Sequence, residues 1–237
     1  FTVFKRQRFN KSFNKLKEFY IKKGYFESQL SYSLEPIEGT SQVDIIIDVK
    51  EGKSGNIKKI IFNGFTNPEK SDLTEQIYLK KYNFLTSWLT GTGIYRDEIL
   101  DQDRATIVNY LHNKGYADAR VDINLTEDPR SGKLIVEITA HRGTLYKTGT
   151  VDFTGNTLLT LDLIQKRSLI HEGEPYSPEK VRETAQAIKD LYGQKGNIDA
   201  SVQFETGLEE SQPVFNIHYS IDEGNQYQIG LIYIFGN

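Results

Sequence analysis

The sequence contains no cysteine and no methionine in 237 residues, and only one tryptophan. The absence of cysteine excludes disulfides, cysteine-based zinc sites and a thiol nucleophile. The longest apolar runs are short, such as Ile45–Ile47, whereas a membrane-spanning helix needs about 20 apolar residues. No transmembrane helix is therefore expected. Because the chain opens with Phe1 and lacks an initiating methionine and a signal peptide, we interpret it as a fragment of a longer protein.

Neither sign of charge dominates the chain. Lysine and arginine number 29 against 32 aspartate and glutamate residues, so the formal net charge of -3 gives no general electrostatic reason to bind nucleic acid. The hydrophobic share of 38% is below the roughly 45–50% usual for globular proteins, but 14 tyrosines and 13 phenylalanines supply bulky apolar surface. This composition predicts two or three small domains rather than a single catalytic core.

Glycines recur along the chain at constant spacing. A helix-like segment ends at Gly24, and again at Gly115 and Gly196. Each of these glycines is followed 28 residues later by a second glycine, and 12 residues further on by a third. The second glycines are Gly52, Gly143 and Gly224, and the third are Gly64, Gly155 and Gly236. The chain is therefore a tandem repeat, in which one ten-residue insertion lengthens the middle unit.

Each complete repeat is predicted to contain three strands. After Gly115, the apolar residues Val121, Ile123 and Leu125 alternate with polar residues, as expected of a strand with one buried face. This strand and the next form a hairpin, and a third strand follows the second glycine. The predicted hairpin strands cover 28–34 and 43–49, 119–125 and 134–140, and 200–205 and 214–221, and the strands after the second glycine cover 57–62, 148–153 and 227–235.

Two helices complete each unit. Apolar residues recur eight, five and four positions before each first glycine, which predicts a helix with one buried stripe. The stripe residues are Leu16, Phe19 and Tyr20, then Ile107, Tyr110 and Leu111, then Ile188, Leu191 and Tyr192. A shorter helix is predicted over 68–80 and over 158–169. The resulting order, strand, helix, helix, strand, strand, predicts a small α+β layer in which two helices cover a three-stranded mixed sheet.

The βααββ order, the Lys-Gly-Tyr at the end of the long helix, the Glu-Gly after the last strand and the Phe-x-Gly-Asn type turn together resemble POTRA domains. These domains are periplasmic modules of BamA-type outer-membrane assembly factors. The sequence departs from the pattern at Asn197, where the aromatic residue is lost, and at Arg142, where the glutamate is lost. The resemblance covers the whole chain and implies tandem POTRA repeats.

The repeats divide the chain into four predicted segments. Residues 1–52 are a partial POTRA domain without its first strand and first helix, 53–143 and 144–224 are complete domains, and 225–237 are the first strand of a following domain. At least four tandem units are implied, and the resemblance is to the BamA class because its members usually have five. The alternative is the substrate-docking region of a related two-partner secretion, TamA-type or organellar import transporter.

No motif predicts an enzyme, a cofactor or a metal site. The sequence Gly52-Lys53-Ser54 lacks the upstream glycine of a phosphate loop, and Gly91-Thr92-Gly93 has no preceding strand. The four histidines are far apart in the sequence, so only a tight spatial cluster could make them metal ligands. Carboxylates crowd the beginning of a predicted helix, where capping is a better interpretation than acid–base catalysis. They are Asp97, Glu98, Asp101 and Asp103.

Residues 5–23 contain eight basic residues and one acidic residue, Glu18. The basic residues are Lys5, Arg6, Arg8, Lys11, Lys15, Lys17, Lys22 and Lys23. Such a run is usually a solvated helix face. With Phe9 and Tyr20 nearby it could instead contact anionic headgroups or a nucleic acid, but these aromatic residues fit a buried stripe, which favours the first interpretation.

A three-stranded sheet leaves edge strands, whose free N–H and C=O groups accept another chain by β-augmentation. In POTRA domains the strand after the Gly-Tyr turn is the usual exposed edge, which corresponds here to 28–34, 119–125 and 200–205. The resemblance implies partner binding, for which the last two strands are the candidates. Their residues are Ala119, Arg120, Val121, Asp122, Ile123, Asn124 and Leu125, and Ala200, Ser201, Val202, Gln203, Phe204 and Glu205. The other interpretation of each strand is an ordinary edge that binds nothing.

The ten-residue insertion places apolar side chains in the connection between two helices. Phe84, Leu85, Trp88 and Leu89 are the candidates for an apolar contact with an accessory subunit or client. Packing of Trp88 into an extended first helix or a domain joint is the favoured alternative.

The resemblance implies a periplasmic scaffold region of a BamA-type protein at the bacterial outer membrane. Its expected partners are unfolded outer-membrane β-barrel proteins and accessory lipoproteins, with periplasmic chaperones as further candidates and no nucleic acid. The region would deliver clients to a C-terminal membrane barrel for folding and insertion. The fragment itself is expected to be soluble and to reach the membrane through that barrel, which this sequence does not contain.

Overall fold

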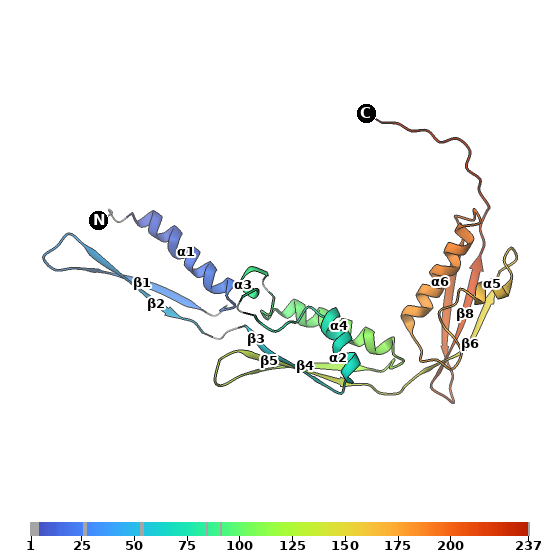
Figure 1. Cartoon of the computed structure of the whole chain (residues 1–237), viewed down its shortest axis with the longest axis horizontal. Helices are drawn as coiled ribbons and strands as arrows, with labels where there is room; N and C mark the ends of the chain where they lie inside the picture. Colours follow the sequence, from blue (N-terminus) through green and yellow to red (C-terminus); the bar gives the residue numbers. More distant parts are fainter. Residues whose placement is uncertain (1–4, 26–27, 53–54, 84, 91, 237) are drawn as a thin grey trace. The chain divides into compact units, whose positions relative to one another are not determined.

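The structure is a computed structural model that describes residues 5–25, 28–52, 55–83, 85–90 and 92–236 (Figure 1). The chain divides into two compact units. Residues 1–107 and 121–140 belong to the first, and residues 108–120 and 141–237 belong to the second.

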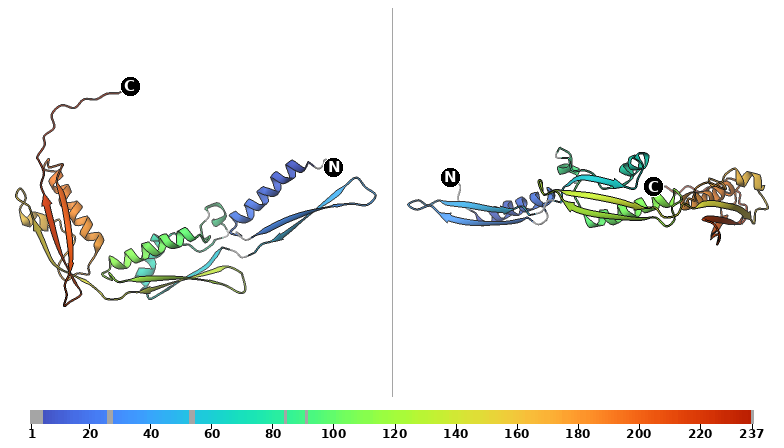
Figure 2. Two further views of the ribbon diagram at one scale, coloured as in Figure 1. Left: turned by 180° about the vertical axis from the view of Figure 1, so that it is seen from behind. Right: turned by 90° about the horizontal axis from the view of Figure 1, so that it is seen from below.

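The first unit contains two sheets and two long helices. Its elements are α1 (Arg6–Lys22), β1 (Gln29–Pro36), β2 (Val43–Lys50), β3 (Ile57–Asn63), α2 (Asn67–Gln76), α3 (Ser87–Thr90), α4 (Asp97–His112, which ends in the second unit), β4 (Arg120–Glu127) and β5 (Leu134–His141). Strands β1 and β2 form an antiparallel pair with Leu30 opposite Val49, and Figure 2 shows α1 running alongside this hairpin. The other sheet has the order β3-β5-β4, with β3 parallel to β5.

The second unit contains one complete sheet with its helices. Its elements are β6 (Lys147–Thr154), α5 (Leu161–Gln165), α6 (Pro178–Gly193), β7 (Ser201–Leu208) and β8 (Val214–Asp222). The sheet has the order β6-β8-β7, in which β6 is parallel to β8 and β7 is antiparallel to it. Figure 1 shows α6 lying along this sheet. The predicted α+β class with mixed three-stranded sheets is confirmed.

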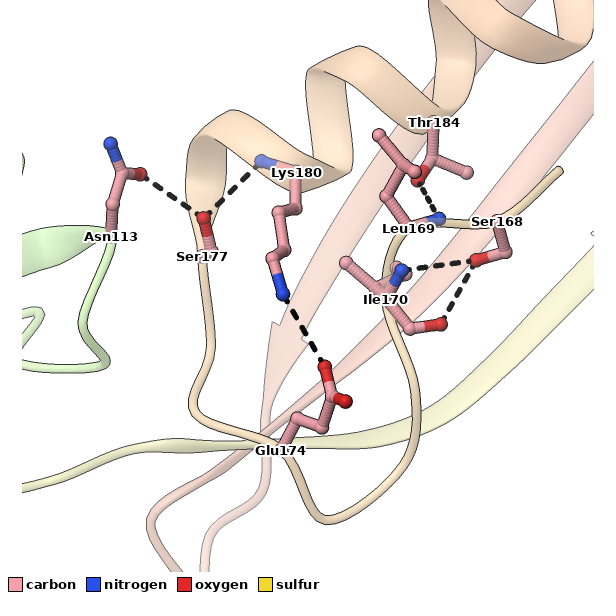
Figure 3. Close-up of polar contacts among 8 residues, drawn as sticks. All are labelled: Asn113, Ser168, Leu169, Ile170, Glu174, Ser177, Lys180 and Thr184. Atoms are coloured by element: carbon pink, nitrogen blue, oxygen red, sulfur yellow. Dashed lines mark hydrogen bonds and ion pairs between the residues drawn. The ribbon is translucent and has the colours of Figure 1, made fainter.

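Helix α6 begins at a complete N-terminal cap. The Ser177 hydroxyl oxygen accepts a hydrogen bond from the Lys180 amide at 3.2 Å, and Pro178 occupies the first helical position (Figure 3). The side-chain oxygen of Asn113 accepts hydrogen bonds from the Ser177 hydroxyl at 3.3 Å and from the Glu179 amide at 3.0 Å. The loop that contains Asn113 is thereby bound to the first turn of α6.

The core of the second unit forms between α6 and the sheet. Ile188 and Tyr192 on α6 are fully buried, as the predicted stripe requires. Phe153 on β6 stacks on Tyr219 on β8 with ring centroids 5.1 Å apart, and the Tyr219 hydroxyl donates a hydrogen bond to the Val181 carbonyl at 2.9 Å. The aromatic residues of this sequence thus supply the apolar volume that its low aliphatic content does not.

Several predicted boundaries were wrong. Helix α2 ends at Gln76 and α5 covers only 161–165, so both are shorter than predicted because the chain after each turns to hydrogen-bond with a long helix. The exposed edges begin one residue later than predicted, since Ala119 and Ala200 precede β4 and β7 and are buried. Phe19 was also placed wrongly in a buried stripe, because 53% of its surface is exposed.

The predicted strand over 227–235 is not a strand in the structure. Ile229, Ile232 and Ile234 in this segment are 75 to 90% exposed. In the complete repeats the equivalent strands β3 and β6 each pair in parallel with a later strand of the same repeat, namely β5 or β8. Among the described residues no later strand pairs with 227–235, and a single strand cannot satisfy its backbone alone.

Candidate functional site

The predicted binding edge of the first unit is strand β4, which lies at the outside of the β3-β5-β4 sheet. Val121 points into the core at 5% exposure, Ile123 and Leu125 are half-buried, and Asp122 and Asn124 are exposed. This alternation agrees with the sequence pattern. The strand therefore presents a polar outer face, and what it offers a partner is its backbone edge.

Strand β7 is the corresponding edge of the second unit, outside β8 in the β6-β8-β7 sheet. Its inward-facing side chains are less well covered than those of β4. Val202 packs against the core, but Phe204 remains 38% exposed and Leu208 is 53% exposed. Phe204 lies against Tyr219 with ring centroids 6.1 Å apart. Strand β7 therefore combines a backbone edge with partly uncovered apolar side chains on the same face of the sheet.

The end of β8 is held by the carboxylate of Glu223. It accepts hydrogen bonds from the amides of Thr157 at 2.7 Å and Leu158 at 2.8 Å, from the Tyr192 hydroxyl at 2.8 Å, and from the Thr157 hydroxyl. Burial alone would raise the pKa of Glu223, but these hydrogen bonds outweigh it and lower the pKa to about 2. Glu223 therefore links β8 to α6 and to the loop after β6.

The two departures from the repeat pattern, Arg142 and Asn197, are in different repeats. They occupy two positions of the repeat that contact each other within each repeat. In the middle repeat the Arg142 guanidinium lies over the ring of Tyr116, 5.0 Å from its centroid. In the last repeat the Asn197 side chain donates a hydrogen bond to the Glu223 backbone carbonyl at 3.1 Å. Each substituted residue thus makes a direct contact with the other position of the pair in its own repeat: Arg142 with Tyr116, and Asn197 with Glu223.

One backbone hydrogen bond recurs where each repeat joins the next. The carbonyl of the helix-ending glycine accepts a hydrogen bond from an amide 31 residues later. The pairs are Gly24 with Gly55 at 2.7 Å, Gly115 with Tyr146 at 2.7 Å, and Gly196 with Tyr227 at 2.8 Å. The three glycines have φ values of 88, 96 and 90°, which only glycine adopts readily. The glycine thus lets the chain leave the helix and presents its carbonyl to the linker.

Two of these joints also have a tyrosine that reaches an aspartate. The Tyr146 hydroxyl donates a hydrogen bond to Asp118 at 2.7 Å, and this hydrogen bond raises the pKa of Tyr146. The Tyr146 ring packs against Phe215 with centroids 5.2 Å apart. The Tyr227 hydroxyl binds Asp199 in the same way, 81 residues further along. At the first joint Gly55 occupies the tyrosine position, so no side chain can make this contact.

The insertion between α2 and α4 forms the short helix α3, which contains Trp88 and Leu89. Phe84 lies outside the described residues. Leu85 is 76% exposed, and the buried Ser87 hydroxyl accepts a hydrogen bond from the Asn83 amide at 2.8 Å. Both interpretations of the insertion, packing of Trp88 and an apolar contact with a partner, stay predictions.

A buried polar position in the long helices was not recognised from the sequence. Asp103 was grouped with capping carboxylates, but it lies inside α4, fully buried, and accepts hydrogen bonds from the amides of Tyr78 and Leu79, both at 2.7 Å. Burial raises its pKa, although these two amides oppose the shift. Thr184, 81 residues later in α6, is also buried and accepts from the Leu169 amide at 3.0 Å (Figure 3). The sequence did contain a signal for this buried position, because Asp103 and Thr184 are polar residues at the same position of two repeats.

Within the described parts of the chain, no group of three His, Asp or Glu side chains is placed to hold a metal ion. Of the four histidines, His218 lies on β8 with its ring Nε2 3.1 Å from the Thr154 hydroxyl. None of the described helices is both long and apolar enough to cross a membrane. The features that remain as candidates for function are the strand edges and the joints.

The fold and its joints define a class of protein, a tandem array of small α+β modules that present open sheet edges. The family POTRA, described as "Surface antigen variable number repeat", matches residues 2–52, 55–141 and 146–224. The chain therefore belongs to the POTRA family.

Relatives among characterised proteins narrow the class further. The chain is 25% identical over 94% of its length to the outer membrane protein assembly factor BamA of Nitratidesulfovibrio vulgaris, and covers 28% of that protein. It is 27% identical over 99% of its length to BamA of Neisseria meningitidis serogroup B, and covers 29% of it. The chain thus spans less than a third of these relatives. A crystal structure of Haemophilus ducreyi BamA lacking POTRA domains 1–3 shares the fold, with a TM-score of 0.50 and 19% identity over 72% of this chain and 30% of that one.

These similarities identify the repeats as POTRA domains of a BamA-type protein. Both relatives are named as outer membrane protein assembly factors, which agrees with the expectation that the chain is not an enzyme. The division into segments 1–52, 53–143, 144–224 and 225–237 stays a prediction.

Proposed function

We propose that this chain is the periplasmic part of an outer-membrane assembly factor that captures unfolded β-barrel proteins by β-augmentation and delivers them to a membrane barrel. Accessory lipoproteins would bind the same array of modules. The observation that carries the proposal is strand β7, an open edge whose inward face leaves Phe204 and Leu208 partly uncovered.

The chemistry of β7 fits a client of this kind. Strands of outer-membrane barrels alternate apolar and polar side chains. A client strand added outside β7 would place every second side chain on the face that carries Phe204 and Leu208, and the intervening polar side chains on the other face. Its backbone would complete the hydrogen bonds of the edge. Affinity would thus come from the backbone and selectivity from the alternation.

Weak binding at each edge suits a scaffold that must release its clients. Strands β4 and β7 are both edges and belong to one chain. Once one segment of a client is bound, tethering raises the effective concentration of the next segment at the second edge. Many reversible contacts can therefore retain an unfolded client without trapping it.

The test is an NMR titration of the chain with short peptides from terminal strands of outer-membrane barrels. Amide shifts concentrated in β7 or β4 support capture. A matched peptide, N-methylated at alternate positions to remove the backbone donors of one edge, should bind far more weakly, because augmentation needs those donors. If no amide of either strand moves at millimolar peptide, edge capture by these modules is wrong.

A second comparison separates the backbone from the side chains. Phe204→Ser should weaken the peptide with alternating apolar residues and leave a peptide of the same length with a polar alternation unaffected. Asn124→Ser on the polar face of β4 is the matched control and should change neither peptide. Equal weakening of both peptides by Phe204→Ser would mean that the substitution disturbs the strand itself.

A further inference from the structure

The outer side of α1 carries a line of positive charge. Four cations, Arg8, Lys11, Lys15 and Lys22, are spaced so that they lie within about 60° of the helix circumference. We call these four residues the cationic stripe. All four are exposed, whereas Phe13 on the opposite side of α1 is buried. The stripe therefore faces solvent and runs about 21 Å along the helix.

The equivalent helices of the other two repeats show whether the fold itself needs the charges of the stripe. Helices α4 and α6 occupy the same place in their repeats as α1 does. The positions equivalent to the stripe are Ile99, Gln102, Thr106 and Asn113 in the α4 repeat, and Lys180, Glu183, Ala187 and Gln194 in the α6 repeat. Neither set has a net positive charge. The fold therefore forms without the stripe, and its charge is a property of the first repeat alone.

An apolar side chain accompanies the stripe. Phe19, four residues after Lys15, lies beside the stripe and is 53% exposed. The residue equivalent to Phe19 in α6 is Leu191, which is 95% covered. The Lys23 ammonium lies over the Phe19 ring, 5.3 Å from its centroid. Lysine side chains and the partly uncovered Phe19 thus share the C-terminal half of this helix surface.

This combination fits the surface of an anionic bilayer. Cations near a membrane are attracted by anionic headgroups, and amphipathic side chains such as Phe insert at the boundary between headgroups and acyl chains. The whole chain has a net charge of -3, so the attraction must be local to the stripe. A nucleic-acid backbone would use the cations but would leave the exposed Phe19 beside the stripe without a role.

We propose that the cationic stripe and Phe19 bind the surface of a membrane that contains anionic phospholipid. The contact would hold the first repeat against a bilayer independently of any membrane barrel. It differs from capture of clients, because it uses the outside of a helix and not a sheet edge.

The test is sedimentation of the 237-residue chain with phosphatidylcholine vesicles, with and without about 30% phosphatidylglycerol. Binding is expected only to the anionic vesicles and should be lost at about 0.5 M salt, which screens charges beyond a few Å. The quadruple variant R8Q/K11Q/K15Q/K22Q should bind at least about tenfold more weakly. F19S should weaken binding but keep its salt dependence.

The matched control is K59Q/K81Q/K189Q/K195Q, which removes the same charge at exposed positions elsewhere and should bind as the wild type does. Circular dichroism and the peptide titration above show whether each variant is folded and still captures clients, so the two proposals can fail separately. The membrane proposal is overturned if anionic vesicles do not bind, if the quadruple variant binds like the wild type, or if both quadruple variants lose binding equally. Binding of duplex DNA without binding of vesicles would also overturn it.

Discussion

Replacing Glu223 with glutamine should destabilise the last repeat in a way that depends on pH. The carboxylate accepts hydrogen bonds from two amides and two hydroxyls, which hold its pKa at about 2 against an ordinary value of 4.5. This difference corresponds to an upper limit of about 3.4 kcal/mol. Because the group borders solvent, screening reduces the expected loss in Glu223→Gln to about 1–2 kcal/mol at neutral pH.

The direction of the pH dependence follows from the lowered pKa of Glu223. A carboxyl whose folded-state pKa lies below its unfolded-state pKa contributes its full stability above the unfolded value, here 4.5. That contribution is lost as the pH falls towards about 2, because the unfolded state then binds a proton that the folded state resists. The stability difference between the wild type and Glu223→Gln should therefore shrink from pH 6 to pH 2.5.

Several modules in one chain do not unfold as one transition, so a local measurement is needed. Amide hydrogen exchange of the buried residues Ile217 and Tyr219 on β8 reports unfolding of this repeat. Exchange in Glu223→Gln should be about 5- to 30-fold faster than in the wild type at pH 6.

The control is Glu210→Gln, in the exposed turn between β7 and β8, and it should leave the exchange of Ile217 and Tyr219 unchanged. An equal acceleration by Glu223→Gln at pH 2.5 and at pH 6 would refute the electrostatic reasoning. No acceleration at either pH would mean that the four hydrogen bonds are not coupled to folding.

Three further changes test the joints and the buried polar position. Gly115→Ala should cost about 1–3 kcal/mol, because φ is 96° and the new Cβ would lie 2.8 Å from the Tyr146 carbonyl oxygen. Amide hydrogen exchange of the buried residue Leu111 in α4 measures this loss, and an unchanged exchange rate would contradict it. Tyr146→Phe removes the hydrogen bond to Asp118 and should therefore speed hydrogen exchange of the amide at position 146. Equal exchange rates in the wild type and the variant would show that the hydroxyl does not hold the joint. Asp103→Ala should lose roughly 2–4 kcal/mol, measured by amide hydrogen exchange of the buried residue Ile107, because two amides lose their acceptor. Asp101→Ala on the exposed side of α4 should lose far less.

The strands and the long helices could be predicted closely because their patterns are local. Alternation along 119–125 reports which side chains face the core, and the structure places β4 only one residue later at its start. The stripe of α6 was likewise correct, since Ile188, Leu191 and Tyr192 are all buried. Phe19 was misplaced because spacing along a helix does not show which of its side chains the rest of the repeat covers.

The ends of the short helices could not be predicted from local patterns. Helix α2 stops at Gln76 because Tyr78 and Leu79 hydrogen-bond to Asp103, a residue 24 to 25 positions away. The sequence assigned Asp103 to a cap, since carboxylates near a helix start usually interact with the helix dipole. Only the packing of α4 against the segment after α2 makes this carboxylate a buried acceptor.

The sequence by itself determined the repeat, the order of its elements and the positions of its glycines, because spacing and alternation depend on local geometry alone. The tertiary structure decided which edges are open, which polar groups are buried and how Tyr146 and Tyr227 reach aspartates near the preceding helix. These features depend on contacts between residues far apart in the sequence, such as Leu79 with Asp103 and Thr157 with Glu223, for which one sequence contains no distance information. The cationic stripe depends on both sequence and tertiary structure. Its charges can be read in the sequence, but the fold decides that they are exposed.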